Sequence, residues 1–152
     1  IREVAKHTPE LAKLIVNAGG ASALVDYVSE AQGNAKLPGI MAVGYIAAFS
    51  ETLALAIIVS KGVLPLREAL VAEPEDHIKA ASAWSLGQIG RHTPDHARAL
   101  AEGDVLRHLL ACMVHEASSD DLKTKSKRAL KAILAKVSEK RSEAKRGRWL
   151  RT

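Results

Sequence analysis

The chain has 152 residues, of which 47% are hydrophobic and only 3% aromatic, and its formal net charge is +5. This length accommodates one ordinary domain or a few small repeats, and so few aromatic residues argue against an all-β sandwich. The single cysteine, Cys112, excludes an intrachain disulfide framework and suits a reducing compartment such as the cytoplasm. No apolar run approaches the ~20 residues of a membrane span, so we expect no membrane association.

The charge is divided unevenly along the chain. Residues 1–121 contain 10 Lys and Arg against 15 Asp and Glu, a net charge of −5, whereas residues 122–152 contain 12 against 2, a net charge of +10. The negative net charge of residues 1–121 argues against a fold that binds nucleic acid over its whole surface. The basic end is therefore a separate candidate for contact with an acidic partner.

The first predicted elements are three helices within residues 8–49. Thr8 followed by Pro9 is typical of a helix N-terminus, and Gly19-Gly20 suits a left-handed helix end. After these glycines, apolar residues at helical spacing predict a second helix over 21–31. A polar break follows, and the pattern then predicts a third helix over about 37–49.

The same order of elements is predicted twice more. A first helix ends at Gly62, a second covers 64–72 and a third covers 77–91. Thr93 and Pro94 start the next first helix, which is followed by helices over 105–116 and 122–137. The last helix has an apolar stripe that we expect to face the stack: Leu122, Ala129, Leu130, Ile133, Leu134 and Val137.

Short phrases of sequence repeat with this helix order. Residues 7–12 (HTPELA) return at 49–54 (FSETLA) and at 92–97 (HTPDHA), and residues 43–46 (VGYI) return at 86–89 (LGQI) and 130–133 (LKAI). A spacing of 42–44 residues is typical of helical solenoid repeats. Three helices per unit, with glycine between the first two, favour armadillo over HEAT repeats.

We therefore predict an all-α chain, a right-handed α-solenoid of about three armadillo repeats with three helices each. The repeats cover 7–49, 50–92 and 93–137. Residues 1–6 are interpreted as the end of a preceding repeat, and residues 138–152 as a basic tail. Because the sequence begins inside a predicted helix, we expect further repeats upstream and self-association through the open solenoid ends.

Several phrases of the chain are similar to one family. They are residues 1–11, 14–20, 37–41, 59–63 and, longest, 73–94 (EPEDHIKAASAWSLGQIGRHTP). Over about residues 1–137 the chain resembles the armadillo proteins of the flagellar central apparatus, the sperm-associated antigen and paralysed-flagella family. The resemblance implies a non-enzymatic protein-interaction scaffold in the cytoskeleton of the flagellar or ciliary axoneme. It also implies central-apparatus components and microtubules as partners, and a role in central-apparatus stability and motility.

Armadillo stacks bind along the surface lined by their third helices. Import carriers of this superfamily repeat Trp-x-x-x-Asn there, a ladder that is absent here, where only Trp84 and Gln88 are comparable. The two side chains predict a binding pocket; the alternative is that Trp84 packs between repeats and Gln88 is solvated. The candidate protein-binding residues on this face are Met41, Tyr45, Trp84, Gln88, Arg128 and Lys131.

The basic end supplies a second candidate surface. It predicts electrostatic contact with an acidic surface such as tubulin's acidic tails, or with nucleic acid; the alternative is a solvated helix and a frayed tail. The candidate basic patch consists of Lys123, Lys127, Lys140, Arg141, Lys145, Arg146 and Arg148.

Neither a metal site nor an active site is predicted. His92 and His96 have the four-residue spacing of a helical metal pair, but Pro94 between them starts a new helix. The sequence offers no glycine-rich phosphate loop and no nucleophile with an evident base, and Cys112 is interpreted as buried packing. We expect no enzyme, no metal, no cofactor and no small-molecule substrate. The rival functions are a soluble armadillo adaptor or import-type carrier of extended peptides, and a nucleic-acid-binding helical repeat.

Overall fold

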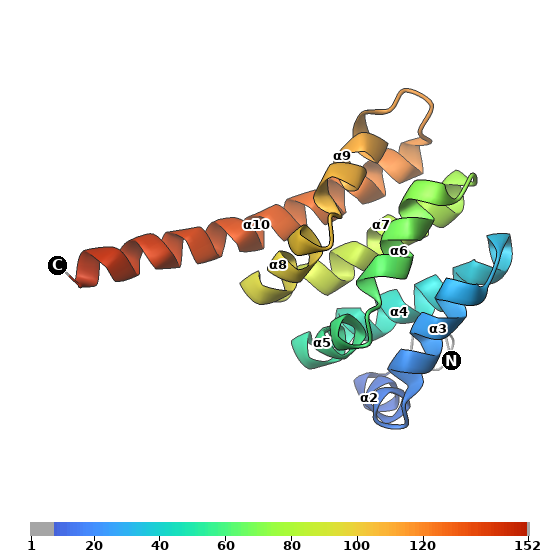
Figure 1. Ribbon diagram of the computed structural model, residues 1–152, viewed down its shortest axis with the longest axis horizontal. Coiled ribbons are helices and arrows are strands. Elements are labelled where there is room, and N and C mark those ends of the chain that lie inside the picture. Colours follow the sequence, from blue (N-terminus) through green and yellow to red (C-terminus); the bar gives the residue numbers. More distant parts are fainter. Residues whose placement is uncertain (1–7, 152) are drawn as a thin grey trace.

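The computed structural model describes residues 8–151, which form nine α-helices and one 3-10 helix and contain no strand. The helices follow one another in three triplets (Figure 1). They are α2 (Pro9–Asn17), α3 (Gly20–Glu30) and α4 (Leu37–Phe49), with η1 (Gly33–Lys36) before α4; α5 (Glu51–Val59), α6 (Val63–Ala72) and α7 (Asp76–Gly90); and α8 (Pro94–Glu102), α9 (Leu106–Val114) and α10 (Asp120–Leu150). The all-α solenoid is confirmed, and the expected end of a preceding repeat, residues 1–6, lies outside the described residues.

Each triplet begins with a hydroxyl cap. The Thr8 Oγ1 accepts a hydrogen bond from the Leu11 N–H at 3.1 Å, and Thr93 caps α8 in the same way through His96 N–H. Pro9 and Pro94 each occupy the first position of the helix that follows, where a missing N–H costs nothing. The two helix starts predicted from the Thr-Pro pairs are confirmed.

The turn between the first and second helix of each triplet contains a left-handed residue. Gly19 adopts this conformation with φ +84°, as predicted, but Gly62 does not, because its φ is −75°. The left-handed residues of the other two turns are Lys61 (φ 63°) and Asp104 (φ 62°). Gly62 instead permits close contact, since a Cβ there would lie 2.6 Å from the Ile57 Cγ2.

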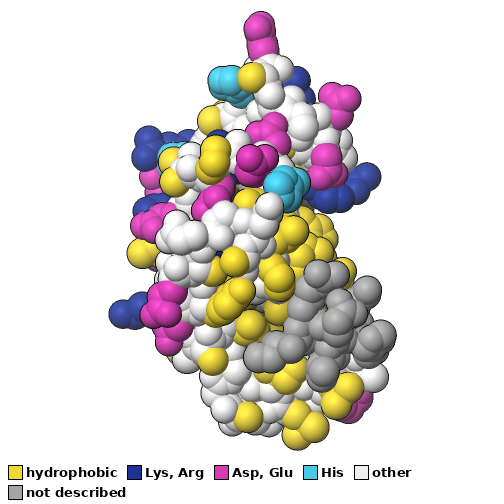
Figure 2. All heavy atoms as spheres, turned by 90° about the vertical axis from the view of Figure 1, so that its right-hand side faces the viewer, with side chains coloured by type: hydrophobic (Ala, Val, Ile, Leu, Met, Phe, Trp, Pro, Cys, Tyr) yellow, Lys and Arg dark blue, Asp and Glu magenta, His cyan; other side chains and the backbone are white. Residues whose placement is uncertain are grey.

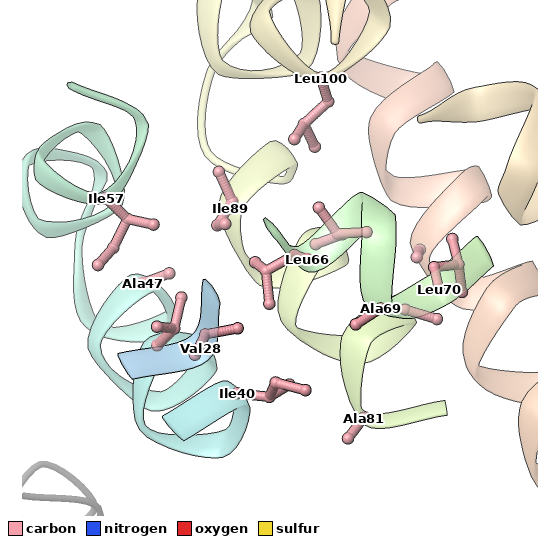
Figure 3. Close-up of a cluster of buried hydrophobic side chains, with 14 of the residues drawn as sticks. Val28, Ile40, Ala47, Ile57, Leu66, Ala69, Leu70, Ala81, Ile89 and Leu100 are labelled. Carbon is pink, nitrogen blue, oxygen red and sulfur yellow. The ribbon is translucent and has the colours of Figure 1, made fainter. Parts of the chain in front are cut away.

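The three third helices lie side by side, with α7 in the middle between α4 and α10. The second helices cover them, α6 against α7 and α9 against α10. Aliphatic side chains from successive triplets meet between these layers (Figure 3). Among residues 8–151, twelve large side chains are fully buried, and each contributes ~1.5–3 kcal/mol to stability. They are Ile40, Ile46, Ile57, Leu66, Leu70, Ile78, Leu86, Ile89, Leu100, Leu109, Leu122 and Ile133.

The last helix differs from its predicted bounds. α10 continues to Leu150, so the predicted end near residue 137 is wrong. The added segment is rich in good helix formers and begins with an ion pair between Lys136 Nζ and Glu139 Oε2 at 2.9 Å. Figure 1 shows this part of α10 projecting beyond the stack. The expected apolar stripe is buried only in part, because Leu134 and Val137 are 45% and 38% exposed.

Hydrophobic side chains also reach the surface at the opposite end of the stack. Figure 2 shows hydrophobic side chains gathered on this side of the molecule. Leu11, Leu14 and Tyr27 of the first triplet are 38%, 63% and 44% exposed.

Within residues 8–151, no single helix is long and apolar enough to span a membrane. Helices α2 and α3 together meet the length and composition criteria, but with an 82° bend between them.

Candidate binding groove on the third helices

Two neighbouring hollows run across the face formed by α4, α7 and α10. The first, which we name the aromatic hollow, has a volume of about 390 Å³ and lies mainly between α4 and α7. The second, the basic hollow, has a volume of about 280 Å³ and lies between α7 and α10. Trp84 and Lys125 line both hollows, which together form one candidate groove.

Trp84 forms the wall between the two hollows. Its ring lies on Gly44 of α4, so closely that a Cβ on Gly44 would overlap the ring. The Tyr45 ring meets it edge-on, with ring centroids 5.1 Å apart and an interplanar angle of 68°. Trp84 is therefore partly buried between two repeats while the rest of its surface faces the groove.

Charges of both signs line the aromatic hollow. The Nε2 of His77 lies 2.6 Å from the Oδ1 of Asn34. Asp121 and Lys125 lie one turn apart on α10, and their charged atoms are 3.7 Å from each other. Met41 and Leu37 of α4 supply the apolar part of the wall.

Only positive charges line the basic hollow. Its cations are Arg91 from α7's C-terminal end and Lys125 and Arg128 from α10, and no carboxylate of the described residues lines the hollow. One Nη of Arg91 donates to the Ala48 carbonyl at 2.6 Å, which holds this side chain across the junction of α4 and α7. Arg128 is exposed and has no ion pair with any residue in the described range. The Gln88 amide adds a polar group to the same wall.

Five of the six predicted groove residues line these hollows. Lys131 is the exception, because its side chain is exposed on α10 outside both of them. Sequence reasoning missed Lys125, Arg91 and His77 as lining residues. Helical spacing indicates that two of them share a face with predicted groove residues, because Lys125 lies three residues before Arg128 and Arg91 three residues after Gln88.

The predicted basic patch is spread along α10. Lys123 and Lys127 lie near the start of the helix, whereas Arg141, Lys145, Arg146 and Arg148 lie on its exposed projecting part. Lys140 joins α10 to α8 of the same triplet through an ion pair, with its Nζ 2.8 Å from the Asp95 Oδ1. The hydrogen bond from Lys140 and its positive charge lower the pKa of the Asp95 carboxyl.

The paired histidines are hydrogen-bonded within the fold. His92 Nε2 lies 2.5 Å from the Ala47 carbonyl oxygen, and His96 Nε2 lies 2.8 Å from the Glu51 carbonyl oxygen. As predicted, α8 begins at Pro94, so the two rings do not share a helix. Burial lowers the pKa of His92, and the nearby Arg91 charge adds to this, against the opposing effect of the Ala47 hydrogen bond. The described part of the chain contains no group of three or more His, Cys, Asp or Glu arranged to hold a metal ion.

Cys112 is partly buried on α9 rather than fully packed. Burial raises the pKa of its thiol. A thiol is a poor nucleophile until it ionises, so this environment does not activate it.

Comparison with known proteins gives matches to both sequence and fold. The chain is 60% identical to sperm-associated antigen 6 of Homo sapiens over 71 residues, and 60% identical to that of Mus musculus over 67 residues. These matches cover 47% and 44% of the chain but only 14% and 13% of the curated relatives, so the chain spans a small part of their length. No family model matches the chain.

Several similar solved structures are designed armadillo repeat proteins. A designed armadillo repeat protein in complex with the peptide (KR)4 has a TM-score of 0.81 at 17% identity, covering 90% of this chain and 59% of its own. Computationally designed armadillo repeat proteins for modular peptide recognition give 0.80 at 19% identity, covering 86% and 54%. At these identities the likeness concerns the fold. In sequence the chain is similar to sperm-associated antigen 6, and in fold it is an armadillo-repeat protein.

Proposed function

We propose that the chain is part of a non-enzymatic protein-interaction scaffold of the central pair in motile axonemes. Its third-helix groove holds a segment of a partner protein, and the scaffold contributes to central-apparatus stability and to motility. The similarity to sperm-associated antigen 6 supports the cellular setting, and the armadillo fold supports binding rather than catalysis.

One observation carries the binding role: a partly exposed tryptophan stands between two open hollows on a single face. Trp84 is fixed from behind by Gly44 and Tyr45, so it meets a partner without first losing side-chain freedom. Tryptophan held in this way is typical of the few residues that carry most of an interface's binding energy.

The partners that we propose are central-apparatus components and microtubules, within the cytoskeleton of the flagellum or cilium. The projecting part of α10 is suited to an acidic surface because cations outnumber carboxylates among its exposed side chains and the helix extends away from the stack.

The test is the location of a fluorescently tagged full-length protein that contains this chain, in a cell with motile flagella. We expect a line of fluorescence along the axoneme, and we expect Trp84→Ala to weaken it. Gln32→Ala, on the loop after α3 and outside both hollows, is the matched control. A diffuse nuclear and cytoplasmic pool would contradict the proposal and favour the soluble adaptor.

Nucleic-acid binding is the second candidate, and the same projecting helix is the observation that favours it. Co-sedimentation with microtubules, with and without competing RNA, separates the two. RNA is added so that its phosphate charge equals the carboxylate charge of the microtubules. If the RNA then removes the chain from the microtubules, the result favours nucleic-acid binding. If the chain stays bound, the result favours the protein scaffold. Both interactions should weaken with added salt, since exposed charges are screened beyond ~8–10 Å at 0.1–0.15 M.

A further inference from the structure

We infer that the groove binds an acidic peptide segment, with carboxylates in the basic hollow and a neighbouring apolar side chain in the aromatic hollow. This inference rests on the proposed function, in which the same face holds a partner segment, and it names the chemistry of that segment.

The charge of the basic hollow is the first argument. Arg91, Lys125 and Arg128 converge on a space of about 280 Å³ whose lining contains no carboxylate. Arg128 has no ion pair within residues 8–151, and the hydrogen bond of Arg91 to Ala48 uses only one of its five N–H groups. Guanidinium groups match carboxylates in a paired, planar geometry, so the hollow is suited to an acidic side chain.

This positive charge is local and runs against the charge of the surrounding body. Residues 1–121 carry a net charge of −5, yet the groove collects Arg91 from that body together with two cations of α10. A basic peptide entering the basic hollow would meet the like charges of Arg91 and Arg128, which is costly where water is partly excluded. The Asp121 carboxylate of the neighbouring aromatic hollow is already paired with Lys125 at 3.7 Å. The segment that fits is thus opposite in charge to the (KR)4 peptide of the designed armadillo protein.

The aromatic hollow supplies the second requirement. Met41, Tyr45 and Trp84 form an apolar wall beside the basic hollow, and Trp84 belongs to both. A segment that fills both must carry an aliphatic or aromatic residue close to its carboxylates. A purely acidic polymer leaves the apolar wall uncovered and should bind more weakly.

Binding can be followed through Trp84 itself. The chain contains two tryptophans, so in a Trp149→Phe background Trp84 is the only source of tryptophan emission. The probes are two peptides of equal length and apolar content, (Glu-Leu-Glu)3 and (Lys-Leu-Lys)3. We expect the acidic peptide to change Trp84 emission in a saturable manner and the basic peptide to leave it unchanged. Saturable binding of the basic peptide alone would overturn the inference.

A pair of matched charge reversals shows whether binding is local. Arg128→Glu and Lys127→Glu change the net charge equally at adjacent exposed positions of α10, but only Arg128 lines the hollow. We expect Arg128→Glu to weaken binding of the acidic peptide about tenfold or more, and Lys127→Glu to weaken it less than about threefold. Equal losses would show a diffuse attraction to α10 and would overturn the proposed site. Circular dichroism verifies that both variants remain folded.

The outcomes separate this inference from the proposed function. If only the basic peptide binds, and titration calorimetry shows that Trp84→Ala abolishes that binding, the groove is still a peptide scaffold but the acidic partner is wrong. If neither peptide changes Trp84 emission, the acidic-segment inference is wrong, while axonemal localisation decides the proposed function independently.

Discussion

The two junctions between successive third helices share one layout but differ in what fills them. In the junction of α4 and α7, Gly44 faces the ring of Trp84. In the junction of α7 and α10, the equivalent Gly87, 43 residues later, faces the backbone of Ala129, whose Cα would lie 3.0 Å from an added Cβ. The first junction is thus spaced by an aromatic ring, and the second is closed by direct helix contact. This difference produces an aromatic hollow beside a basic one.

The outer ends of the junctions differ in the same way. At the first, Arg91 and His92 reach the free carbonyls at the end of α4, those of Ala48 and Ala47. At the second, α10 is instead tied to α8 of its own triplet, by the exposed ion pair of Lys140 with Asp95. One third helix is therefore held at its end by hydrogen bonds from the next repeat and the other by an exposed ion pair, and the two regions should respond differently to mutation, pH and salt.

The largest effect is expected from Gly44→Ala. The new Cβ would overlap the Trp84 ring, which must leave its place on α4, and overpacking of this kind costs about 1–3 kcal/mol of unfolding free energy. Urea unfolding measures the loss, and Trp84 emission in the Trp149→Phe background reports the displaced ring. If stability is unchanged and the emission does not shift, the ring is not held by Gly44.

Lower pH should weaken the first junction. Because burial lowers the pKa of His92 below its ordinary value of 6.5, the unfolded chain binds a proton that the folded chain resists. This contribution to stability is intact above pH 6.5 and is lost as the pH falls from there toward the lowered pKa. His92→Gln, which can still donate to the Ala47 carbonyl, should flatten the pH dependence of the melting temperature. His115→Gln, at an exposed histidine, is the control and should leave the slope as it was.

Gly87→Ala, the matched change at the second junction, should alter stability by less than about 1 kcal/mol. Alanine gains ~1 kcal/mol of helix propensity over glycine, and the 3.0 Å contacts with Ala129 offset that gain. Urea unfolding beside Gly44→Ala gives the comparison directly. A loss as large as that of Gly44→Ala would mean that the two junctions are equally rigid at this position.

The sequence predicted the helix order, the capped helix starts and five of the residues that line the candidate groove, because these depend on local patterns. Thr8 and Thr93 with their following prolines act within one turn, and the repeat places Tyr45, Trp84 and Arg128 on equivalent faces. These are short-range or periodic features, which a single sequence records.

Other features depend on contacts between distant residues or on competing backbone choices. Trp84 can pack against α4 and still face the groove because Gly44, 40 positions earlier, lacks a Cβ. Lys61 rather than Gly62 takes the left-handed conformation because it occupies the turn position of Gly19 and Asp104, the left-handed residues of the other two triplets. The length of α10, by contrast, depends on local sequence, because residues after 137 are rich in good helix formers. The interpretation of these residues as a tail rests on the absence of a repeat pattern there.

The smallest effect is expected from Lys140→Met, which removes the ion pair between α10 and α8. Both partners of the Lys140–Asp95 pair are exposed, so water and salt screen their attraction and the melting temperature should hardly change at neutral pH. The pKa of Asp95 should nevertheless rise toward its ordinary value, because the hydrogen bond from Lys140 is the main cause of its depression. An NMR titration of the Asp95 carboxyl measures this rise, with Arg141→Met as the control of equal charge. A large fall in the melting temperature of Lys140→Met would contradict this prediction. If high salt lowered the melting temperature of the parent by the same amount, the pair would be shown to fix the projecting part of α10 to the stack.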